Sequence, residues 1–316
     1  MVKSIDWNLY PYELLLELKR AHRKRDLELT KEMLPKFVFL CGKDINIDGG
    51  GNRQLISDLY SKNRNDIISV YSERLFSIFD LNTVDLLSFE ELLAELSDGI
   101  ILFVESYGTA CELGAFAMRD ELLDKLLVIN GKEHYGKNTF INDGPIKKVQ
   151  NRDEKRVIFA EMQAPFSSPA VLDSFIGFIE KNKKFRLNLD SGKVHLNPFV
   201  YELLELVTLL QPIQKNQLIH IYKFVKGFTS FEYFSNRNNK TTKKIQLTQI
   251  LELMNSLDLV IINDQGFISI NPCSEYDYRN IMFRLDVSRH NKLRAKFLNR
   301  KYKRKNSGLV VKVAAI

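Results

Sequence analysis

The chain has 316 residues, of which 45% are hydrophobic, and this is enough for two or three domains with a packed core. No run approaches the roughly 20 consecutive apolar residues that cross a bilayer, and the first residues do not resemble a signal peptide. The three cysteines are too few and too scattered for a disulfide framework or a closed zinc site. We therefore expect a cytoplasmic chain with free thiols, no bound metal and no membrane contact.

The net charge of +7 is divided unevenly along the chain. Residues 1–180 contain 22 Lys and Arg against 29 Asp and Glu, whereas residues 181–316 contain 24 Lys and Arg against 10 Asp and Glu. The first part is acidic, with a net charge of −7, and the second is strongly basic, with a net charge of +14. This asymmetry suggests two tasks, and we expect the basic part to bind a polyanion, for which nucleic acid is the usual candidate.

Helical and strand patterns alternate after an initial helical stretch at 9–34, which Pro35 closes. Short apolar runs predict buried strands at 37–41, 67–71, 99–103, 125–129 and 155–159. Helices are predicted between them at 53–62, 88–96 and 109–123, the second opened by a capping box of Ser88 and Glu91. The alternation predicts an α/β fold with a doubly wound parallel sheet.

The rest of the chain is predicted to hold a helical connector and a winged-helix-like domain. Helix candidates at 199–210, 217–225 and 244–256 are followed by two β-rich runs around a turn at 263–266, which is the order of a winged helix-turn-helix. The predicted division is an N-terminal helical segment at 1–35, a catalytic domain at 36–160, a connector at 161–198, a winged-helix-like domain at 199–288 and a basic tail at 289–316.

Basic residues gather at two places in the second half. The candidates for contact with nucleic acid are Lys240, Lys243, Lys244, Lys301, Lys303 and Arg304. An ordinary solvated basic surface would carry similar charges, and no pattern for reading bases is visible. We therefore expect contacts with the phosphate backbone rather than with bases.

The segment SDGIILFVESYGTACELGAF, residues 97–116, carries the chemistry. A strand leads into a glycine-containing turn and then a helix, and ligands of open α/β sheets bind at the carboxyl ends of strands. Glu112 is expected in the first turn of this helix, where its carboxylate could attack the anomeric carbon of a bound riboside. Acids are also favoured in first turns by the helix dipole alone, so the position by itself leaves a structural role open.

This segment resembles the nucleoside 2-deoxyribosyltransferase family, and more closely the effectors of bacterial retron anti-phage systems that carry the same fold. The resemblance to these effectors extends over blocks in the same order and at similar spacing. The blocks are FVFLCGKD (37–44), YSERLF (71–76), LLSFEELLAELSDGIILFVES (86–106), GTACELGAF (108–116) and TFINDGPIKKV (139–149). The deoxyribosyltransferases usually have an Asp six residues before the Glu, and Ser106 takes that position here, as it does in the retron effectors.

The resemblance implies roles for particular residues. Glu112 becomes the nucleophile and Asp98 an acid that orients the substrate. The residues implied to line the substrate site are Cys41, Gly42, Ser106, Gly108, Thr109 and Asn142. In the transferases the asparagine equivalent to Asn142 helps to complete a neighbouring site, which implies a dimer or a larger assembly.

For the retron effectors the implied activity is hydrolysis of NAD at the nicotinamide–ribose bond, with NAD as substrate and no resident cofactor. The enzyme would be a toxin held inactive by the retron reverse transcriptase with its branched DNA and RNA (msDNA and msrRNA). Two alternatives stay open. One is a nucleoside or nucleotide N-glycosidase or deoxyribosyltransferase, and the other is a DNA-binding regulator without enzymatic activity.

Overall fold

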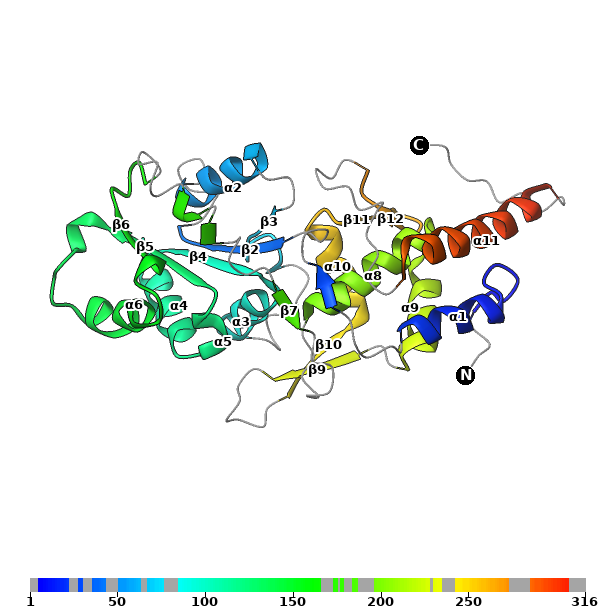
Figure 1. Ribbon diagram of the computed structural model, residues 1–316, viewed down its shortest axis with the longest axis horizontal. Helices are drawn as coiled ribbons and strands as arrows, with labels where there is room; N and C mark the ends of the chain where they lie inside the picture. The colour runs from blue at the N-terminus through cyan, green and yellow to red at the C-terminus, as the bar shows by residue number, and fades with distance from the viewer. Residues whose placement is uncertain are drawn as a thin grey trace.

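Five parallel strands in the order β3-β2-β4-β5-β6 form a sheet in one half of the protein (Figure 1). This computed structural model describes residues 5–22, 28–30, 36–43, 51–63, 67–76, 85–165, 173–175, 177–178, 184–186, 196–227, 230–234, 242–272 and 285–306. The strands are β2 (Lys36–Cys41), β3 (Ile67–Val70), β4 (Gly99–Phe103), β5 (Leu126–Gly131) and β6 (Val157–Ala160). The predicted α/β class with a parallel sheet is confirmed, whereas the assignment to a deoxyribosyltransferase-like fold stays a prediction.

Helices cover both faces of this sheet. They are α2 (Gly51–Asn63), α3 (Leu86–Leu96), α4 (Tyr107–Ala117), α5 (Asp120–Leu123) and α6 (Lys147–Arg152), with short turns η4 (Lys132–His134), η5 (Asn142–Ile146) and η6 (Glu154–Arg156). Phe37 and Phe39 of β2 enter the core shared with α3 and α4, while Val38 and Leu40 enter a second core that contains Ile56 of α2. Because β2 is buried on both faces, its sequence is a continuous apolar run rather than an alternating one.

The other half is mainly helical. Its elements are α8 (Leu196–Leu210), β8 (Ile213–Gln214), α9 (Lys215–Lys226), β9 (Ser230–Phe234), β10 (Thr242–Gln246), α10 (Leu247–Ser256), β11 (Val260–Ile262), β12 (Phe267–Ile270) and α11 (Val287–Asn306). Strands β11, β12 and β8 form an antiparallel sheet in that order, and β9 pairs with β10. The hairpin predicted around residues 263–266 is confirmed, and the winged-helix assignment stays a prediction.

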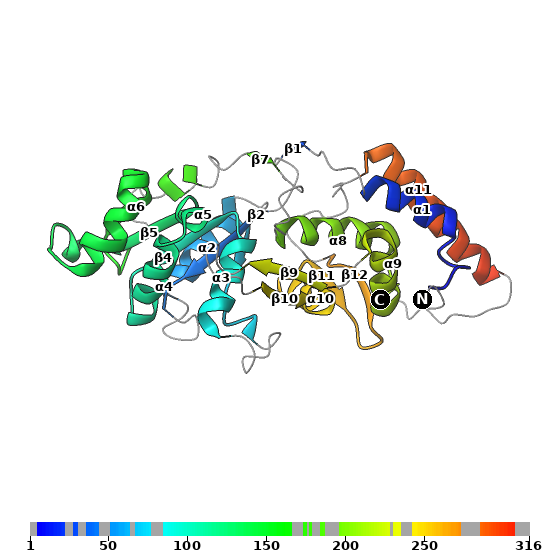
Figure 2. The ribbon, with the colours of Figure 1, turned by 90° about the horizontal axis from the view of Figure 1, so that it is seen from below.

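The N-terminal helix α1 (Tyr12–His22) packs at the end of the molecule away from the parallel sheet, beside α11 (Figures 1 and 2). Arg289 of α11 donates to the Glu17 carboxylate of α1 over 3.3 Å. Strand β1 (Glu28–Thr30) pairs with β7 (Lys184–Arg186). Among the described residues, no helix combines the length and apolarity that a bilayer crossing requires.

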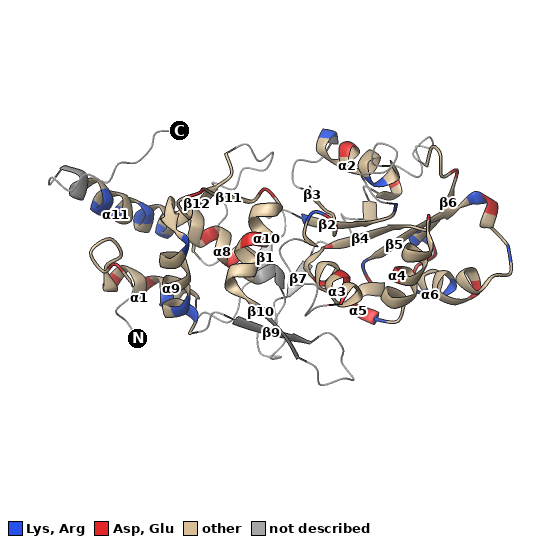
Figure 3. Cartoon of the chain, turned by 180° about the vertical axis from the view of Figure 1, so that it is seen from behind, with Lys and Arg blue, Asp and Glu red and all other residues tan. Residues whose placement is uncertain are grey.

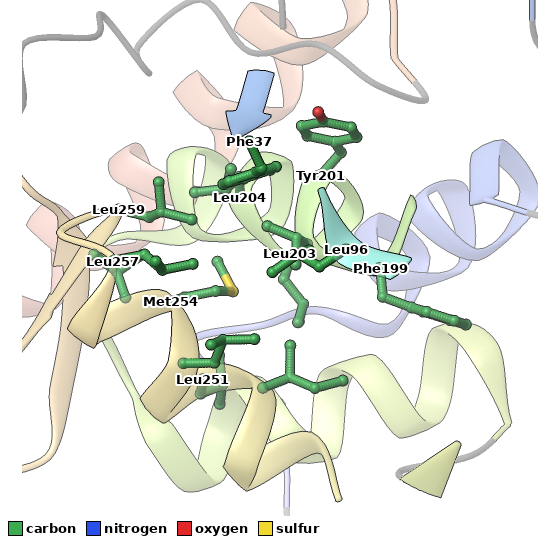
Figure 4. Close-up of a cluster of buried hydrophobic side chains, with 14 of the residues drawn as sticks. Phe37, Leu96, Phe199, Tyr201, Leu203, Leu204, Leu251, Met254, Leu257 and Leu259 are labelled. Carbon is green, nitrogen blue, oxygen red and sulfur yellow. The ribbon is translucent and has the colours of Figure 1, made fainter. Parts of the chain in front are cut away.

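One hydrophobic cluster joins the two halves at the amino end of the parallel sheet (Figure 4). Phe37 at the start of β2 stacks on Tyr201 of α8, with 6.1 Å between ring centroids. Leu96 at the end of α3 lies in the same cluster as Leu203 of α8 and Met254 of α10. The helical half thus covers the amino end of the sheet, and the ligand-binding carboxyl ends of the strands lie at its other edge.

Several element boundaries differ from the predicted ones. The predicted helix at 9–34 is α1 alone, followed within the described residues by strand β1. The predicted helix at 109–123 is divided into α4 and α5 at Met118. The N-cap of α3 is Asp85 rather than Ser88, because the Asp85 carboxylate accepts from the Ser88 N–H at 2.8 Å and from its hydroxyl at 2.7 Å. The division into domains is untested by these boundaries and stays a prediction.

Candidate active site

The candidate site lies where β2 and β4 end side by side. The two strands are neighbours in the sheet, and Cys41 of β2 is in register with Leu102 of β4. Helix α2 follows β2 and helix α4 follows β4, so both helices begin at this edge. The sheet thereby brings together residues 41–43, the segment from 104 to 112 and the start of α2.

The start of α4 is fastened by a reciprocal cap. Ser106 is the N-cap, and its hydroxyl accepts from the Thr109 N–H at 3.2 Å. The Thr109 hydroxyl accepts in turn from the N–H groups of Ser106 and Glu105, both at 3.0 Å. Ser106 and Thr109, predicted to bind substrate, are therefore part of the helix cap in this structure. The cap fixes where the following turns of α4, including Glu112, meet the sheet.

Glu112 lies in the second turn of α4, and not in the first turn as predicted. Its side chain points at Cys41, and its Oε2 atom is buried with no hydrogen-bond partner among the described residues. Burial raises the pKa of the Glu112 carboxyl, a hydrogen bond with the Cys41 thiol and the charge of Arg53 lower it, and the charge of Glu73 raises it. A helix dipole does not explain a carboxylate this far into the helix, since that effect is confined to the first turn.

Glu90 of α3 is a site residue that sequence reasoning missed. It is 5% exposed, and burial followed by the negative charge of Glu112 raises its pKa to about 8. At neutral pH Glu90 therefore carries a proton beside the Glu112 carboxyl. The signal was present in the sequence: an acid placed among Phe89, Leu92 and Leu93 lies on the apolar face of a helix.

Among the residues that the structure describes, Cys41, Glu90 and Glu112 form a group whose ligand atoms all lie within 4.8 Å of one another. Such a group has the spacing of a metal site. Burial, and then the charges of Glu112 and Glu90, raise the pKa of the Cys41 thiol well above its usual value. A metal binds the thiolate and the carboxylate, so two of these three groups would have to lose a proton first. This cost argues against a metal at neutral pH, and the expected absence of a metal stays a prediction.

Gly42 and Glu105 tie the two strand ends together. The Glu105 carboxylate accepts from the Lys43 N–H at 2.9 Å and from the Asn52 amide at 2.6 Å. A Cβ on Gly42 would lie 3.1 Å from Glu105 Oε2 and 3.0 Å from Arg53 Cγ, so a larger residue there would have to displace these side chains by a few tenths of an ångström. Gly108 has no such crowding, since the nearest atom to a Cβ there is the Ser106 hydroxyl at 3.6 Å.

The structure corrects the predicted role of Asp98. This residue directly precedes β4, so it lies at the amino end of the strand, whereas Glu112 meets Cys41 at the carboxyl end of β2. Cys41 lies four residue steps beyond Phe37 along the strand, which is about 13 Å. The Asp98 carboxylate accepts from the Phe37 N–H at 2.9 Å and is buried. Asp98 thus holds the starts of β2 and β4 together and does not reach the candidate site.

Asp98→Ala is expected to lower the free energy of unfolding by about 2 kcal/mol, because it leaves the buried Phe37 N–H without its acceptor. Turnover per folded molecule should be unchanged. Urea unfolding measures the first effect and an activity assay on the folded protein measures the second. If the variant remains folded but loses most of its turnover, Asp98 has a catalytic role after all.

Asn142 begins η5, after β5. Its amide donates to the carbonyls of His134 at 2.7 Å and Lys137 at 2.8 Å, and its oxygen accepts from the Asn130 amide at 3.4 Å. Within this chain these bonds brace the loop after β5, and among the described residues Asn142 has no hydrogen bond with Glu112. The predicted role of Asn142 across an interface stays a prediction.

Of the residues predicted to contact nucleic acid, the structure describes the side chain of Lys301. Lys240 lies outside the described residues, and Lys243 and Lys244 belong to β10 without described side chains. Lys303 and Arg304 fall in α11, again without described side chains.

Lys301 is half-buried and contacts another part of the chain, and its predicted contact with a phosphate stays a prediction. Its Nζ donates to the Pro212 carbonyl at 2.9 Å, and Arg294 donates to the carbonyls of Leu209 and Gln211 at 2.7 and 2.9 Å. The two cations thus donate to carbonyls at and just after the end of α8, which have no partner within the helix. The exposed basic residues among the described side chains of α11 are Lys292, Lys296 and Arg300, which sequence reasoning did not single out, and Lys296 Nζ lies 3.9 Å from the Glu17 carboxylate. Figure 3 shows the basic residues along α11.

A family described as "STM3845 retron effector protein" matches residues 50–262. The match spans α2 to β11 and so includes Glu90, Asp98 and Glu112.

Two proteins of Escherichia coli are similar in sequence. One is named as a proposed ribosyltransferase/DNA-binding protein of retron Ec73 and is 28% identical over 215 residues, which are 62% of this chain and 68% of that protein. The other has the same description for retron Ec86 and is 37% identical over 145 residues, which are 45% of this chain and 44% of that protein. The second alignment thus spans less than half of that relative.

Proposed function

The chain belongs to the STM3845 retron effector family, and from that premise we propose that its α/β half is an N-glycosidase that hydrolyses NAD at the nicotinamide–ribose bond, with Glu112 as nucleophile. The observation that carries the proposal is the Glu112 carboxyl itself. It is largely buried at the carboxyl edge of the sheet, one of its oxygens has no partner among the described residues, and a neutral Glu90 lies beside it. A carboxylate kept partly unpaired is available to a substrate carbon.

The proposed reaction has two steps. In the first, a Glu112 oxygen bonds to the anomeric carbon while the carbon–nitrogen bond breaks, and the bonding electrons pass to the pyridinium nitrogen. Nicotinamide then leaves as a neutral molecule, so no proton has to be supplied to it. In the second, water attacks the same carbon, the Glu112 carboxylate is released, and ADP-ribose and a proton are the products. The single negative charge of Glu112 stabilises the developing oxocarbenium ion in a low-dielectric site.

The ribose and phosphates of NAD are assigned to the loops around Glu112. Cys41 and Gly42 close one side of the site, and Ser106, Gly108 and Thr109 form the start of α4 on the other. Backbone N–H groups at a helix start suit an anionic ligand. Asn142 would be contributed to the site of a second copy in a dimer or larger assembly. The ribosyltransferase description of the two relatives supports chemistry at a ribosyl carbon.

The helical half is proposed to bind the msDNA and msrRNA of a retron together with its reverse transcriptase, and so to hold the enzyme inactive. Exposed Lys292, Lys296 and Arg300 follow one another at four-residue spacing along one side of α11, which suits a phosphate backbone. The order of α8, α9, α10 and the β11–β12 hairpin is that of a winged helix. Both relatives are described as DNA-binding, which supports this assignment.

The test is NAD turnover by the purified full chain, with nicotinamide and ADP-ribose both quantified. We expect equal amounts of the two products, and less of both when the reverse transcriptase–msDNA complex is added. If the complex does not change turnover, the proposed inhibition is overturned, whereas the proposed hydrolysis of NAD still stands. If NAD stays intact both alone and with the complex, hydrolysis of NAD is overturned.

A second candidate function is cleavage of nucleosides or nucleotides, by hydrolysis or by deoxyribosyl transfer. The observation that favours it is the proton that Glu90 carries at neutral pH. A nucleobase leaves a ribose poorly unless it is protonated, and a buried acid with a raised pKa is the usual donor. Incubating the protein with a pool of nucleosides and assaying released bases distinguishes this function from NAD cleavage.

A further inference from the structure

Arg53 is a buried cation beside the candidate site with no role assigned so far. It lies in the first turn of α2 and is 2% exposed. Its guanidinium makes a two-pronged contact with the Glu73 carboxylate, at 3.1 and 2.5 Å, and donates to the Leu40 carbonyl at 3.4 Å. Its Nε is also buried and has no hydrogen-bond partner among the described residues.

The position of Arg53 follows from the end of β2. Its Cγ and Cδ would lie 3.0 and 3.1 Å from a Cβ on Gly42, so the side chain passes directly against the residue that follows Cys41. The Cys41 thiol is in turn within 4.8 Å of carboxylate oxygens of Glu90 and Glu112. The Arg53 side chain and the group of Cys41, Glu90 and Glu112 therefore lie at the same end of β2, with Arg53 paired to Glu73 from the turn after β3.

We propose that Arg53 is a positioning residue: its buried guanidinium is the counter-charge that keeps the Glu112 carboxyl ionised and ready to attack. This inference rests on the proposed function, because it concerns the nucleophile of that reaction. An arginine keeps its charge at any pH at which the protein is folded, so it suits this role. The Coulombic effect of Arg53 acts on Glu112, Glu90 and Cys41 in the same direction, lowering the pKa of each.

The neighbouring charges show why a counter-charge is needed. The groups that face Glu112 are Cys41 of β2, Glu73 after β3, Glu90 of α3 and Arg53 of α2. Burial raises the pKa of Cys41 and of Glu90 and so favours their protonated forms, and the negative charge of Glu73 raises the pKa of Glu112. Among the described residues, Arg53 supplies the positive charge that acts on Glu112. Without it, burial and the charge of Glu73 would both favour the protonated, unreactive form of Glu112.

A purely structural role makes a different prediction. If Arg53 only clamps the turn after β3 to α2, its replacement lowers stability and leaves the pH dependence of catalysis unchanged. Removing Arg53 alone also leaves Glu73 without its partner, and such a protein can fail to fold. The test therefore compares Glu73→Gln, which keeps the cation, with the double variant Arg53→Met/Glu73→Gln, which removes both partners of the pair.

The measurement is kcat/KM for NAD from pH 5 to pH 9, which reports ionisation in the free enzyme. On the acidic side activity is lost as pH falls through the pKa of Glu112. In Glu73→Gln this loss should begin at a lower pH than in the wild type, because one competing negative charge is gone. In the double variant it should begin at a higher pH, with kcat/KM at the acidic end reduced about tenfold against Glu73→Gln. If kcat/KM falls at the same pH on the acidic side in both variants, the proposal is overturned.

A second readout needs no substrate. The carboxyl carbon of Glu112 is titrated by NMR in protein labelled with ¹³C-glutamate, with Glu112→Gln identifying the signal. We expect the same order: lowest midpoint in Glu73→Gln, then the wild type, then the double variant. If the wild type cleaves no NAD while this order holds, the proposed function fails and the role of Arg53 stands. If NAD is cleaved and the midpoints coincide, the function stands and the role of Arg53 is overturned.

Discussion

Glu112→Gln is expected to reduce NAD cleavage by at least about a thousandfold, because an amide cannot form the glycosyl ester on which the two-step reaction depends. The protein should remain folded. Glutamine has nearly the same shape, and burial already raises the pKa of the Glu112 carboxyl, so a neutral side chain is tolerated at this position. The measurement is the rate of nicotinamide release, with thermal unfolding recorded on the same preparations.

The matched control is Glu121→Gln, which makes the same chemical change on α5 at a more exposed acid beside Arg119. It should retain the wild-type rate. In cells, Glu112→Gln should remove toxicity while preserving association with the reverse transcriptase–msDNA complex. A variant that still releases nicotinamide at a rate near that of the wild type would exclude Glu112 as nucleophile.

Glu90→Gln is expected to separate the two candidate substrate classes. With NAD the leaving group is already neutral after bond cleavage, so an amide in place of the protonated carboxyl should cost no more than about tenfold in rate. With a nucleoside the leaving base needs a proton, and loss of the only acid assigned here to supply it should cost about 10²–10⁴ in rate. The measurement is the rate of base release from a nucleoside and of nicotinamide release from NAD at pH 7, for the wild type and for Glu90→Gln.

The same variant should change the pH dependence of stability. The pKa of Glu90 is raised to about 8, so the folded state binds a proton that the unfolded chain releases near its ordinary value of 4.5. This contribution is fully present below the ordinary value and is lost as pH rises through about 8. Glu90→Gln should remove this loss, whereas Glu91→Gln, on the same helix beside Arg119, should keep it. Identical pH–stability curves for Glu90→Gln and the wild type would show that Glu90 is ionised in the folded protein.

Local patterns in the sequence were sufficient for the central strands and for the order of strand, turn and helix around Glu112. Continuous apolar runs such as those at 37–41 and 99–103 occur where a strand is buried on both faces, and both are strands of the parallel sheet. The turn at 263–266 joins two paired strands, because the Asn and Gly there suit a hairpin. Around Glu112 a strand, a glycine turn and a helix follow one another within 20 residues, and the resemblance to the retron effectors is what implied this residue as the nucleophile.

Local patterns failed where two candidates compete within a few residues. Asp85 and Ser88 are both good N-caps, and the one whose side chain reaches the open N–H groups is Asp85. The acid at Asp98 and the lysine at Lys301 look available in the sequence, yet backbone groups of other elements bind both. A one-dimensional pattern does not show which end of a sheet or which side of a helix a polar group faces.

The sequence by itself thus determined the α/β class, the order of the central strands and helices and the basic character of the second half. It also singled out Glu112, whose role as nucleophile stays a prediction. Only the tertiary structure decided what surrounds that carboxyl. Glu90, Glu73 and Arg53 come from three separate segments, and they meet because parallel strands bring their carboxyl ends to one edge. The charges and burial that set the pKa of Glu112 therefore depend on contacts across the sheet, which no spacing along the chain specifies.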